Sequence, residues 1–272
     1  GIQRQAFNTV YQLAALSREH PEELEAADRF LMVPEYLNYL LTGHMVNEYT
    51  NATTTNLVNA RTCTWDAFAL EAAEVPARLF GEIAMPGTVV GGLAPEVQQR
   101  VGFDARVMLP ATHDTGSAFL AVPARDAQAV YLSSGTWSLL GVEHEGPITS
   151  DASRYQNFTN EGGYLKRFRF LKNIMGLWMI QSIRRELNGV SYVSGKSAQL
   201  KRAAKAIGFG ELADAARAEQ RLHPDAPVPH VNVNDDRFLA PASMIEEIKA
   251  ACRETGQPVP DTVGELMRCV YE

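Results

Sequence analysis

Apolar positions in the first third of the chain recur with the period of a helix. A stripe at helical spacing runs from Phe7 to Leu16 and predicts a helix there. His20-Pro21 ends it, because a proline disfavours the helical region for the residue before it. Short helices are also expected over Leu24 to Phe30 and over Pro34 to Leu41, with Gly43 as a C-terminal stop.

Further along, short apolar strands alternate with helical segments, and this alternation predicts an α/β fold. A strand over Arg106 to Ala111 leads into a helix over Thr115 to Val122, and Val130 to Leu132 pairs with Trp137 to Glu143. Asp261 is expected to cap the last helix. The other elements expected are a strand over 45–49 and helices over 94–101, 173–187, 197–207, 212–218 and 244–254.

The polar, turn-prone stretch 123–128 is the best candidate for a domain boundary and divides the chain into residues 1–122 and 123–272. The chain has 272 residues, of which 46% are hydrophobic and 21% are charged. This composition is typical of a globular protein with one large or two medium domains. The net charge of -7 argues against a nucleic-acid partner or an anionic membrane surface.

Three cysteines, Cys63, Cys252 and Cys269, lie far apart and form no C-x-x-C pair. They predict free thiols in a reduced cytoplasm, with no disulfide framework and no zinc site. No apolar run is long enough to span a bilayer, and the first residues lack the apolar core of a signal peptide. The sequence therefore predicts no membrane partner.

Asp114 is the first candidate for chemistry, because it lies where an apolar strand gives way to a helix. Function gathers at such junctions in α/β folds. A carboxylate there can accept a proton from a substrate hydroxyl, and phosphoryl transfer asks little more of a protein than positioning and charge neutralisation. The alternative is that Asp114 only caps the helix that begins at Thr115.

The turn Ser133-Ser-Gly135-Thr136 offers hydroxyls and backbone N–H groups to a phosphate, and Gly135 would allow a positive φ and a close approach. Such turns in hairpins are also often only structural. In the predicted helix 173–187, Asn173 and Gln181 differ by about 80° in direction and about 12 Å along the axis. One helix could therefore contact a substrate and a nucleotide, or the two side chains could simply be exposed.

Asp114-Thr-Gly also occurs in aspartic peptidases, which need two aspartates sharing a proton. The chain holds no second Asp-Thr-Gly or Asp-Ser-Gly, and its helical segments do not fit the small all-β domains of such enzymes. A peptidase is thus the weaker interpretation.

Several longer stretches carry a family resemblance. These are Leu31 to Gly43, Asn47 to Thr55, His113 to Thr115, Tyr131 to Gly141, Leu171 to Gln181 and Arg237 to Pro260. With these motifs in this order, the chain resembles the FGGY carbohydrate kinases, and within them the branch that acts on L-rhamnulose. Pro34-Glu-Tyr-Leu, together with the string that follows at 47–51, distinguishes it from glycerol and xylulose kinases.

The resemblance implies an actin-like ATPase fold of two ribonuclease-H-like domains around a cleft. It implies MgATP-dependent phosphorylation of L-rhamnulose at its C1 hydroxyl. There are two alternatives: a kinase of the same family that acts on another ketose, of the fuculose or xylulose type, and a non-catalytic sugar-binding relic. By motif match, Asp114 is the catalytic base. The sugar would be contacted by His113, Asp114, Thr115 and Asn173, and ATP by Gly135, Thr136 and Gln181.

The chain also departs from the family pattern. The family begins with an Asp-x-Gly phosphate loop, which does not precede Gly1, and its glycine-rich adenosine segment would lie beyond Glu272. We therefore expect an internal fragment with an incomplete first domain. On its own, this fragment is expected to have no kinase activity.

Overall fold

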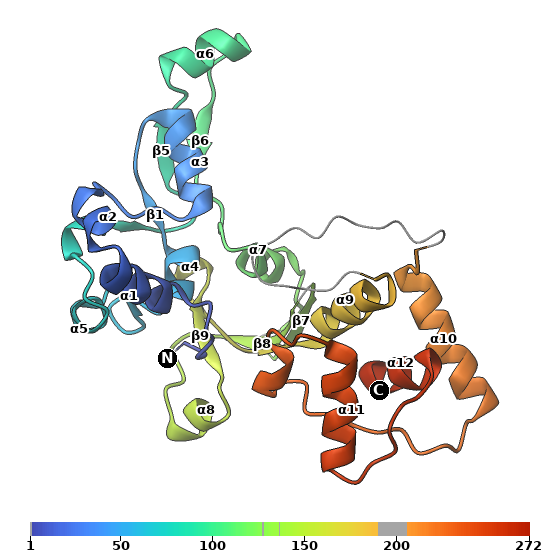
Figure 1. Cartoon of the computed structure of the whole chain (residues 1–272). Helices are drawn as coiled ribbons and strands as arrows, with labels where there is room; N and C mark the ends of the chain where they lie inside the picture. The colour runs from blue at the N-terminus through green and yellow to red at the C-terminus, as the bar shows by residue number, and fades with distance from the viewer. Residues whose placement is uncertain (1, 127, 136, 190–205) are drawn as a thin grey trace. The chain divides into compact units, whose positions relative to one another are not determined.

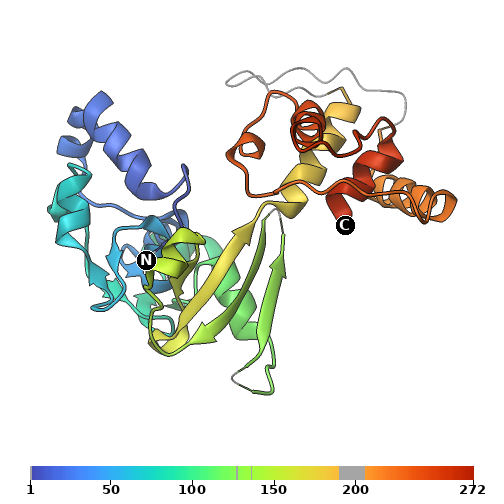
Figure 2. The same ribbon diagram turned by 90° about the horizontal axis from the view of Figure 1, so that it is seen from below.

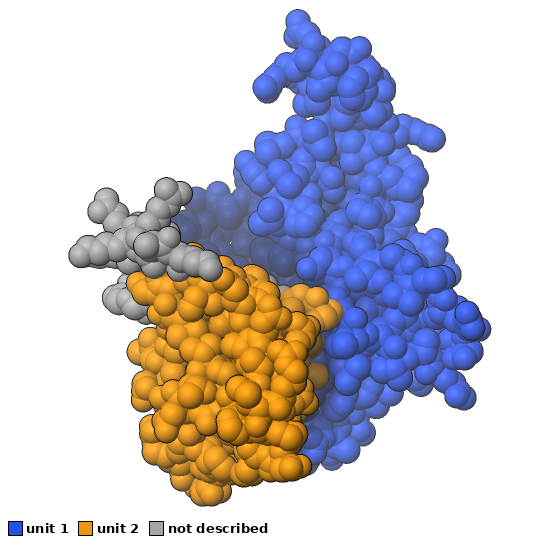
Figure 3. Space-filling view, turned by 90° about the vertical axis from the view of Figure 1, so that its right-hand side faces the viewer, with its two compact units in different colours: residues 1–133, 139–172 blue, residues 134–138, 173–272 orange. Residues whose placement is uncertain are grey.

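The computed structural model describes residues 2–126, 128–135, 137–189 and 206–272. It forms two compact units, which Figure 3 shows in different colours. Unit 1 contains residues 1–133 and 139–172, and unit 2 contains residues 134–138 and 173–272. The division of the whole protein into domains 1–122 and 123–272 stays a prediction.

Unit 1 begins with three helices, α1 (Thr9–Glu19), α2 (Pro21–Ala26) and α3 (Val33–Thr42). The stops predicted for the first and third helices are confirmed, since His20 follows α1 and Gly43, with φ of 76°, follows α3. The helix predicted over Leu24 to Phe30 is shifted toward the N-terminus, because Pro21 suits the first helical turn and starts the helix itself. The core beneath α1 and α2 consists of Leu13, Leu24, Leu57, Leu70, Ala73, Val75 and Leu79.

Short elements follow α3, and their strands form two-stranded pairs. The strand β1 runs parallel to β4, whereas β2 with β3 and β5 with β6 are antiparallel. The predicted strand over 106–111 ends earlier, at Met108. The elements are β1 (Asn47–Glu48), α4 (Tyr49–Ala52), the 3₁₀ turn Thr53–Thr55, β2 (Val58–Asn59), β3 (Thr64–Trp65), α5 (Ala67–Ala72), β4 (Ile83–Ala84), β5 (Val89–Gly92), α6 (Pro95–Val101) and β6 (Arg106–Met108).

The largest sheet has four strands in the order β7-β8-β10-β9 (Figure 2). The predicted hairpin is confirmed by the neighbouring strands β7 (Val130–Ser134) and β8 (Ser138–His144). Beside α7 (Asp114–Ala121), Phe119 packs with Tyr131 and Leu171 of this sheet. The remaining elements are α8 (Asp151–Tyr155), β9 (Thr159–Gly162) and β10 (Phe168–Ile174).

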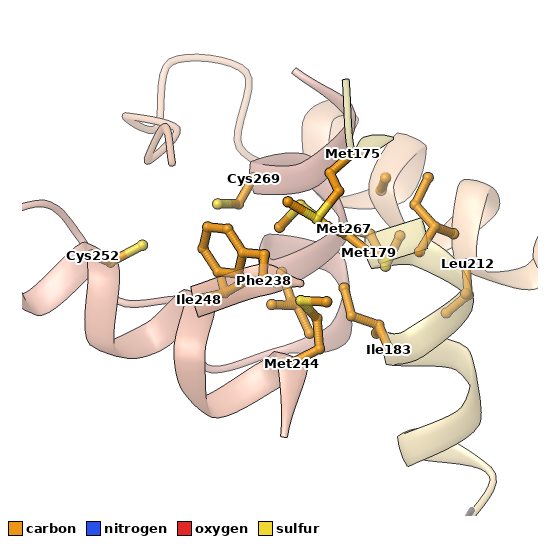
Figure 4. Packing of buried hydrophobic residues seen from close by; sticks show 13 residues of the cluster. Met175, Met179, Ile183, Leu212, Phe238, Met244, Ile248, Cys252, Met267 and Cys269 are labelled. Atoms are coloured by element: carbon orange, nitrogen blue, oxygen red, sulfur yellow. The ribbon is translucent and has the colours of Figure 1, made fainter. Parts of the chain in front are cut away.

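Unit 2 contains four α-helices among its described residues, α9 (Gly176–Leu187), α10 (Phe209–Leu222), α11 (Met244–Glu254) and α12 (Val263–Tyr271), and a 3₁₀ turn, Asp236–Phe238. The α-helices are labelled in Figure 1. Their apolar faces enclose one core, which includes Met179, Leu212, Phe238, Ile248 and Met267 (Figure 4).

Two helix starts in unit 2 differ from the prediction, and one predicted helix falls mostly outside the described residues. The helix predicted over 173–187 begins only at Gly176, because Asn173 and Ile174 continue strand β10. The cap of the last helix is Thr262, whose hydroxyl accepts the N–H of Glu265, and not Asp261. The helix predicted over 197–207 falls mostly on 190–205, outside the described residues.

Within the part of the chain that the structure describes, no helix combines the length and the apolar character needed to cross a membrane. All three cysteines are free thiols, as predicted.

Candidate functional site

Asp114 is the first residue of α7, and its side chain is 95% exposed. Its Oδ1 accepts the N–H of Thr115 at 2.7 Å and lies 3.5 Å from Nε2 of His113. No described residue donates a hydrogen bond to Oδ2. The carboxylate is thus held through one oxygen, while the other is open to a proton from a substrate.

The structure does not support the alternative that Asp114 only caps α7. His113, not Asp114, occupies the N-cap position, and the side chain of His113 makes no capping bond. Within the described part of the chain, Asp114 accepts hydrogen bonds only from Thr115, from its N–H and, at 3.4 Å, from its hydroxyl.

His113 lies between Asp114 and two buried charges. Its side chain is 20% exposed, and its Nδ1 lies 3.0 Å from Nη1 of Arg169 and 3.4 Å from Oε2 of Glu161. Burial lowers the pKa of His113; Glu161 acts against this, and the positive charge of Arg169 lowers the pKa further. The imidazole is therefore neutral near pH 7.

Arg169 and Glu161 face each other across strands β10 and β9. Their side chains are 1% and 8% exposed, and Nη2 of Arg169 lies 3.4 Å from Oε2 of Glu161. The same Nη2 donates to the backbone oxygen of Gly162 at 2.9 Å. Removing either partner of such a pair leaves a buried charge without compensation, which is costly.

A second buried group of polar residues holds the loop before α7. Oε2 of Glu48 accepts the hydroxyl of Thr112 at 2.7 Å and its N–H at 3.1 Å. The hydroxyl of Thr50 also donates to Glu48 and accepts the N–H of His113 at 3.3 Å. These bonds fix the backbone that carries His113 and Asp114.

Behind Glu48 lies a further buried carboxylate, Glu35. It accepts the N–H groups of Glu48 and Met32, at 2.8 and 2.7 Å, and the side-chain amide of Asn47 at 3.0 Å. Burial nevertheless raises the pKa of Glu35.

Three predicted residues, His113, Asp114 and Thr115, are consecutive in the chain and lie at the start of α7 in unit 1. Sequence reasoning missed Arg169, Glu161 and Glu48, which support them. The available signal is that Glu161 and Arg169 are charged residues within strand-like segments. A charge that is buried in such a segment requires a partner.

The other predicted residues belong to unit 2, and Thr136 lies outside the described residues. Gly135 is exposed in the hairpin turn and donates its N–H to the backbone oxygen of Trp137 at 2.9 Å. Its φ is not in the left-handed region, so the turn does not require glycine for that reason. Asn173 lies in β10 and not on a helix, whereas Gln181 lies on α9, both partly buried. The expectation that one helix presents both side chains is wrong.

Among the described residues, no group of three or more His, Cys, Asp or Glu side chains is placed to hold a metal ion.

Two protein-family models match nearly the entire chain. The N-terminal domain of the FGGY family of carbohydrate kinases matches residues 1–121, and the C-terminal domain matches residues 130–272. The chain belongs to the FGGY family of carbohydrate kinases. This confirms the resemblance that the sequence motifs indicated.

Curated relatives are similar to the chain over its full length. A protein named rhamnulokinase from Oceanobacillus iheyensis is 49% identical and one from Halalkalibacterium halodurans is 50% identical, each covering 100% of this chain. The same name is given to a protein from Bacteroides thetaiotaomicron that is 41% identical. The chain spans about half the length of these relatives, 53%, 53% and 52% respectively.

Solved structures of this family share the fold. The ligand-bound xylulose kinase from Lactobacillus acidophilus matches with a TM-score of 0.66 at 17% identity, over 99% of this chain and 50% of that chain. A gluconate kinase from the same organism matches with a TM-score of 0.65 at 16% identity, over the same shares. The α/β fold of the actin-like ATPase class, predicted from the sequence, is confirmed.

Proposed function

We propose that the protein is an ATP-dependent ketose kinase that phosphorylates L-rhamnulose at its C1 hydroxyl. The observation that carries the proposal is the carboxylate of Asp114, which is held through Oδ1 and open at Oδ2. The choice of sugar is supported by the name rhamnulokinase, which relatives 41–50% identical to this chain bear.

In the proposed reaction, Oδ2 of Asp114 accepts the proton of the C1 hydroxyl as that oxygen attacks the γ-phosphorus of ATP. The new bond joins the C1 oxygen to phosphorus, the bond from phosphorus to the β–γ bridging oxygen breaks, and ADP leaves. A positioned general base of this kind typically contributes about 10²–10⁴-fold to the rate.

The remaining assignments are predictions from the family resemblance. His113, Thr115 and Asn173 would contact the sugar. ATP would be contacted by Gly135, Thr136 and Gln181. A Mg²⁺ ion would neutralise charge on the phosphates, and it needs no dedicated cluster of ligands because kinases hold it largely through the nucleotide. We also propose a cytoplasmic location, in line with the three free thiols.

The test measures ADP release with MgATP and a panel of L-rhamnulose, L-fuculose and D-xylulose, using the protein in the full length that its gene encodes. We expect L-rhamnulose to give the highest kcat/KM, with turnover lost on Asp114→Asn. Preference for another ketose would keep the reaction and correct the substrate. If no ketose elicits ADP release, the kinase proposal fails and sugar binding without catalysis becomes the better interpretation.

A further inference from the structure

Arg169 is fully buried, and in space only the side chain of His113 separates it from the proposed base, Asp114. Its Nη1 contacts Nδ1 of His113 at 3.0 Å, and Nε2 on the opposite side of that imidazole lies 3.5 Å from Oδ1 of Asp114. His113 thus stands directly between the guanidinium and the carboxylate.

A guanidinium group has only donors. A contact of 3.0 Å between Nη1 and Nδ1 therefore requires that Nδ1 offers its lone pair. In a neutral imidazole, the single proton must then reside on Nε2. The Nε2–H group faces Asp114 as a donor, at a distance that is electrostatic contact and not a short hydrogen bond.

Glu161 is the competitor in this arrangement. Its Oε2 lies 3.4 Å from Nδ1 of His113 and would favour a proton on that nitrogen. The same oxygen lies 3.4 Å from Nη2 of Arg169, so the guanidinium engages the carboxylate as well as the imidazole. Without Arg169, the Glu161 carboxylate would draw a proton onto Nδ1.

Further contacts hold the guanidinium of Arg169 in place. Nη2 is tied to the backbone oxygen of Gly162 at 2.9 Å, and Gly116 of α7 leaves space for Nη1 where a Cβ would come within 3.1 Å. Helix α7 therefore lies close against the guanidinium at the turn that begins with Asp114.

We propose that Arg169 is a positioning residue for the base: its guanidinium keeps His113 neutral with the proton on Nε2, so that a donor faces Oδ1 of Asp114 and Oδ2 is left to take the substrate proton. The catalytic part of this inference rests on the proposed function, whereas the state of His113 does not.

The first experiment needs no variant of Arg169. Long-range ¹H–¹⁵N spectra of the protein labelled in its six histidines distinguish the two neutral tautomers and the imidazolium form. The His113 signals are identified by their loss in His113→Gln. We expect the Nε2–H tautomer at pH 7.5. An Nδ1–H tautomer or an imidazolium at that pH would overturn the proposal.

The second experiment removes the guanidinium with Arg169→Met. The groups facing His113 are then Glu161 on β9, Asp114 on α7 and Glu48 on β1, all acidic. We expect His113 to bind a proton on Nδ1, and kcat with L-rhamnulose to fall at least tenfold. The acidic limb of the kcat profile should also move to higher pH, because the His113 pKa rises; a loss of folded protein alone would not move it.

Two further variants keep the test decisive. Gly116→Ala presses on the guanidinium without removing its charge, and it should increase the Nδ1–H tautomer even if Arg169→Met fails to fold. Arg154→Met removes an exposed guanidinium of α8 and should leave the tautomer and kcat unchanged. An unaltered His113 tautomer in Arg169→Met, or in Gly116→Ala where Arg169→Met does not fold, would overturn the proposal. If no ketose is phosphorylated, the proposed function fails, while the spectra still decide whether Arg169 sets the state of His113.

Discussion

Nη1 of Arg169 lies 3.1 Å from the point that a Cβ on residue 116 would occupy, so Gly116 and Arg169 share one space beneath α7. Because the guanidinium is also bonded to the backbone oxygen of Gly162 and to His113, it has little freedom to retreat. The glycine thus permits the close packing of α7 on a buried charge.

We therefore expect Gly116→Ala to destabilise the protein. Overpacking typically costs about 1–3 kcal/mol, and the better helix propensity of alanine returns about 1 kcal/mol, which leaves a net loss of about 1 kcal/mol. Urea unfolding measures it.

The matched control is Gly210→Ala on α10, where an added Cβ meets no atom within 4 Å. This change should be neutral or stabilising, by up to about 1 kcal/mol. A Gly116→Ala protein as stable as the wild type would show that Arg169 can move aside.

A second prediction concerns Asp114→Asn. Asparagine keeps an oxygen that can accept the N–H of Thr115, so the start of α7 should be retained. An amide cannot take the C1 proton, and kcat should fall by about 10²–10⁴-fold. The KM for the ketose should stay within a few-fold of the wild-type value, as steady-state kinetics can measure.

The control for this prediction is Asp151→Asn, an exposed aspartate at the start of α8 that should leave kcat unchanged. If Asp114→Asn retains near-normal kcat, Asp114 is not the base.

The start of α7 was predictable from the sequence. Helical periodicity, proline and glycine punctuation identified α1, α3, α11 and the strand-to-helix junction at Asp114, because those signals are local. The family motifs then indicated that His113, Asp114 and Thr115 contact the sugar, which stays a prediction.

Arg169 could not be assigned in the same way. It is 56 residues from His113 in the sequence, and its contact with the imidazole depends on the pairing of β9 with β10 and on the placement of α7. Asn173 shows a different limit: an apolar run such as that around it fits a strand end or a helix start equally well, and sheet pairing settled it as strand.

The thiols give a third prediction. Cys252 and Cys269 are buried in the core of unit 2 (Figure 4), where burial raises the pKa of both thiols and, with Cys252 nearby, brings that of Cys269 to about 12. Since the thiolate is the reactive form, neither should react with a disulfide reagent in the folded chain. Cys63 is partly exposed and should react.

Titration of the 272-residue chain with such a reagent should therefore detect one thiol in buffer and three in denaturant. The Cys63→Ser variant should show none in buffer. Reaction of either remaining thiol in the native Cys63→Ser protein would contradict the burial of this pair.

The last prediction follows from Glu35, whose pKa is raised by burial although three donors contact its carboxylate. The folded state therefore holds this proton at pH values where the unfolded chain has already released it. The free energy of unfolding that Glu35 contributes is fully present below the ordinary glutamate pKa, and it is lost as the pH rises toward the raised pKa of the folded state. Within this window, the wild type should lose stability relative to Glu35→Gln by up to about 1.4 kcal/mol per pH unit. Urea unfolding of both proteins across the window, from the ordinary glutamate pKa upward, measures this difference. The control is Glu71→Gln at an exposed position of α5, whose free energy of unfolding should follow that of the wild type across the same window. A constant difference between the wild type and Glu35→Gln would mean that the carboxylate has the same pKa in the folded and unfolded states.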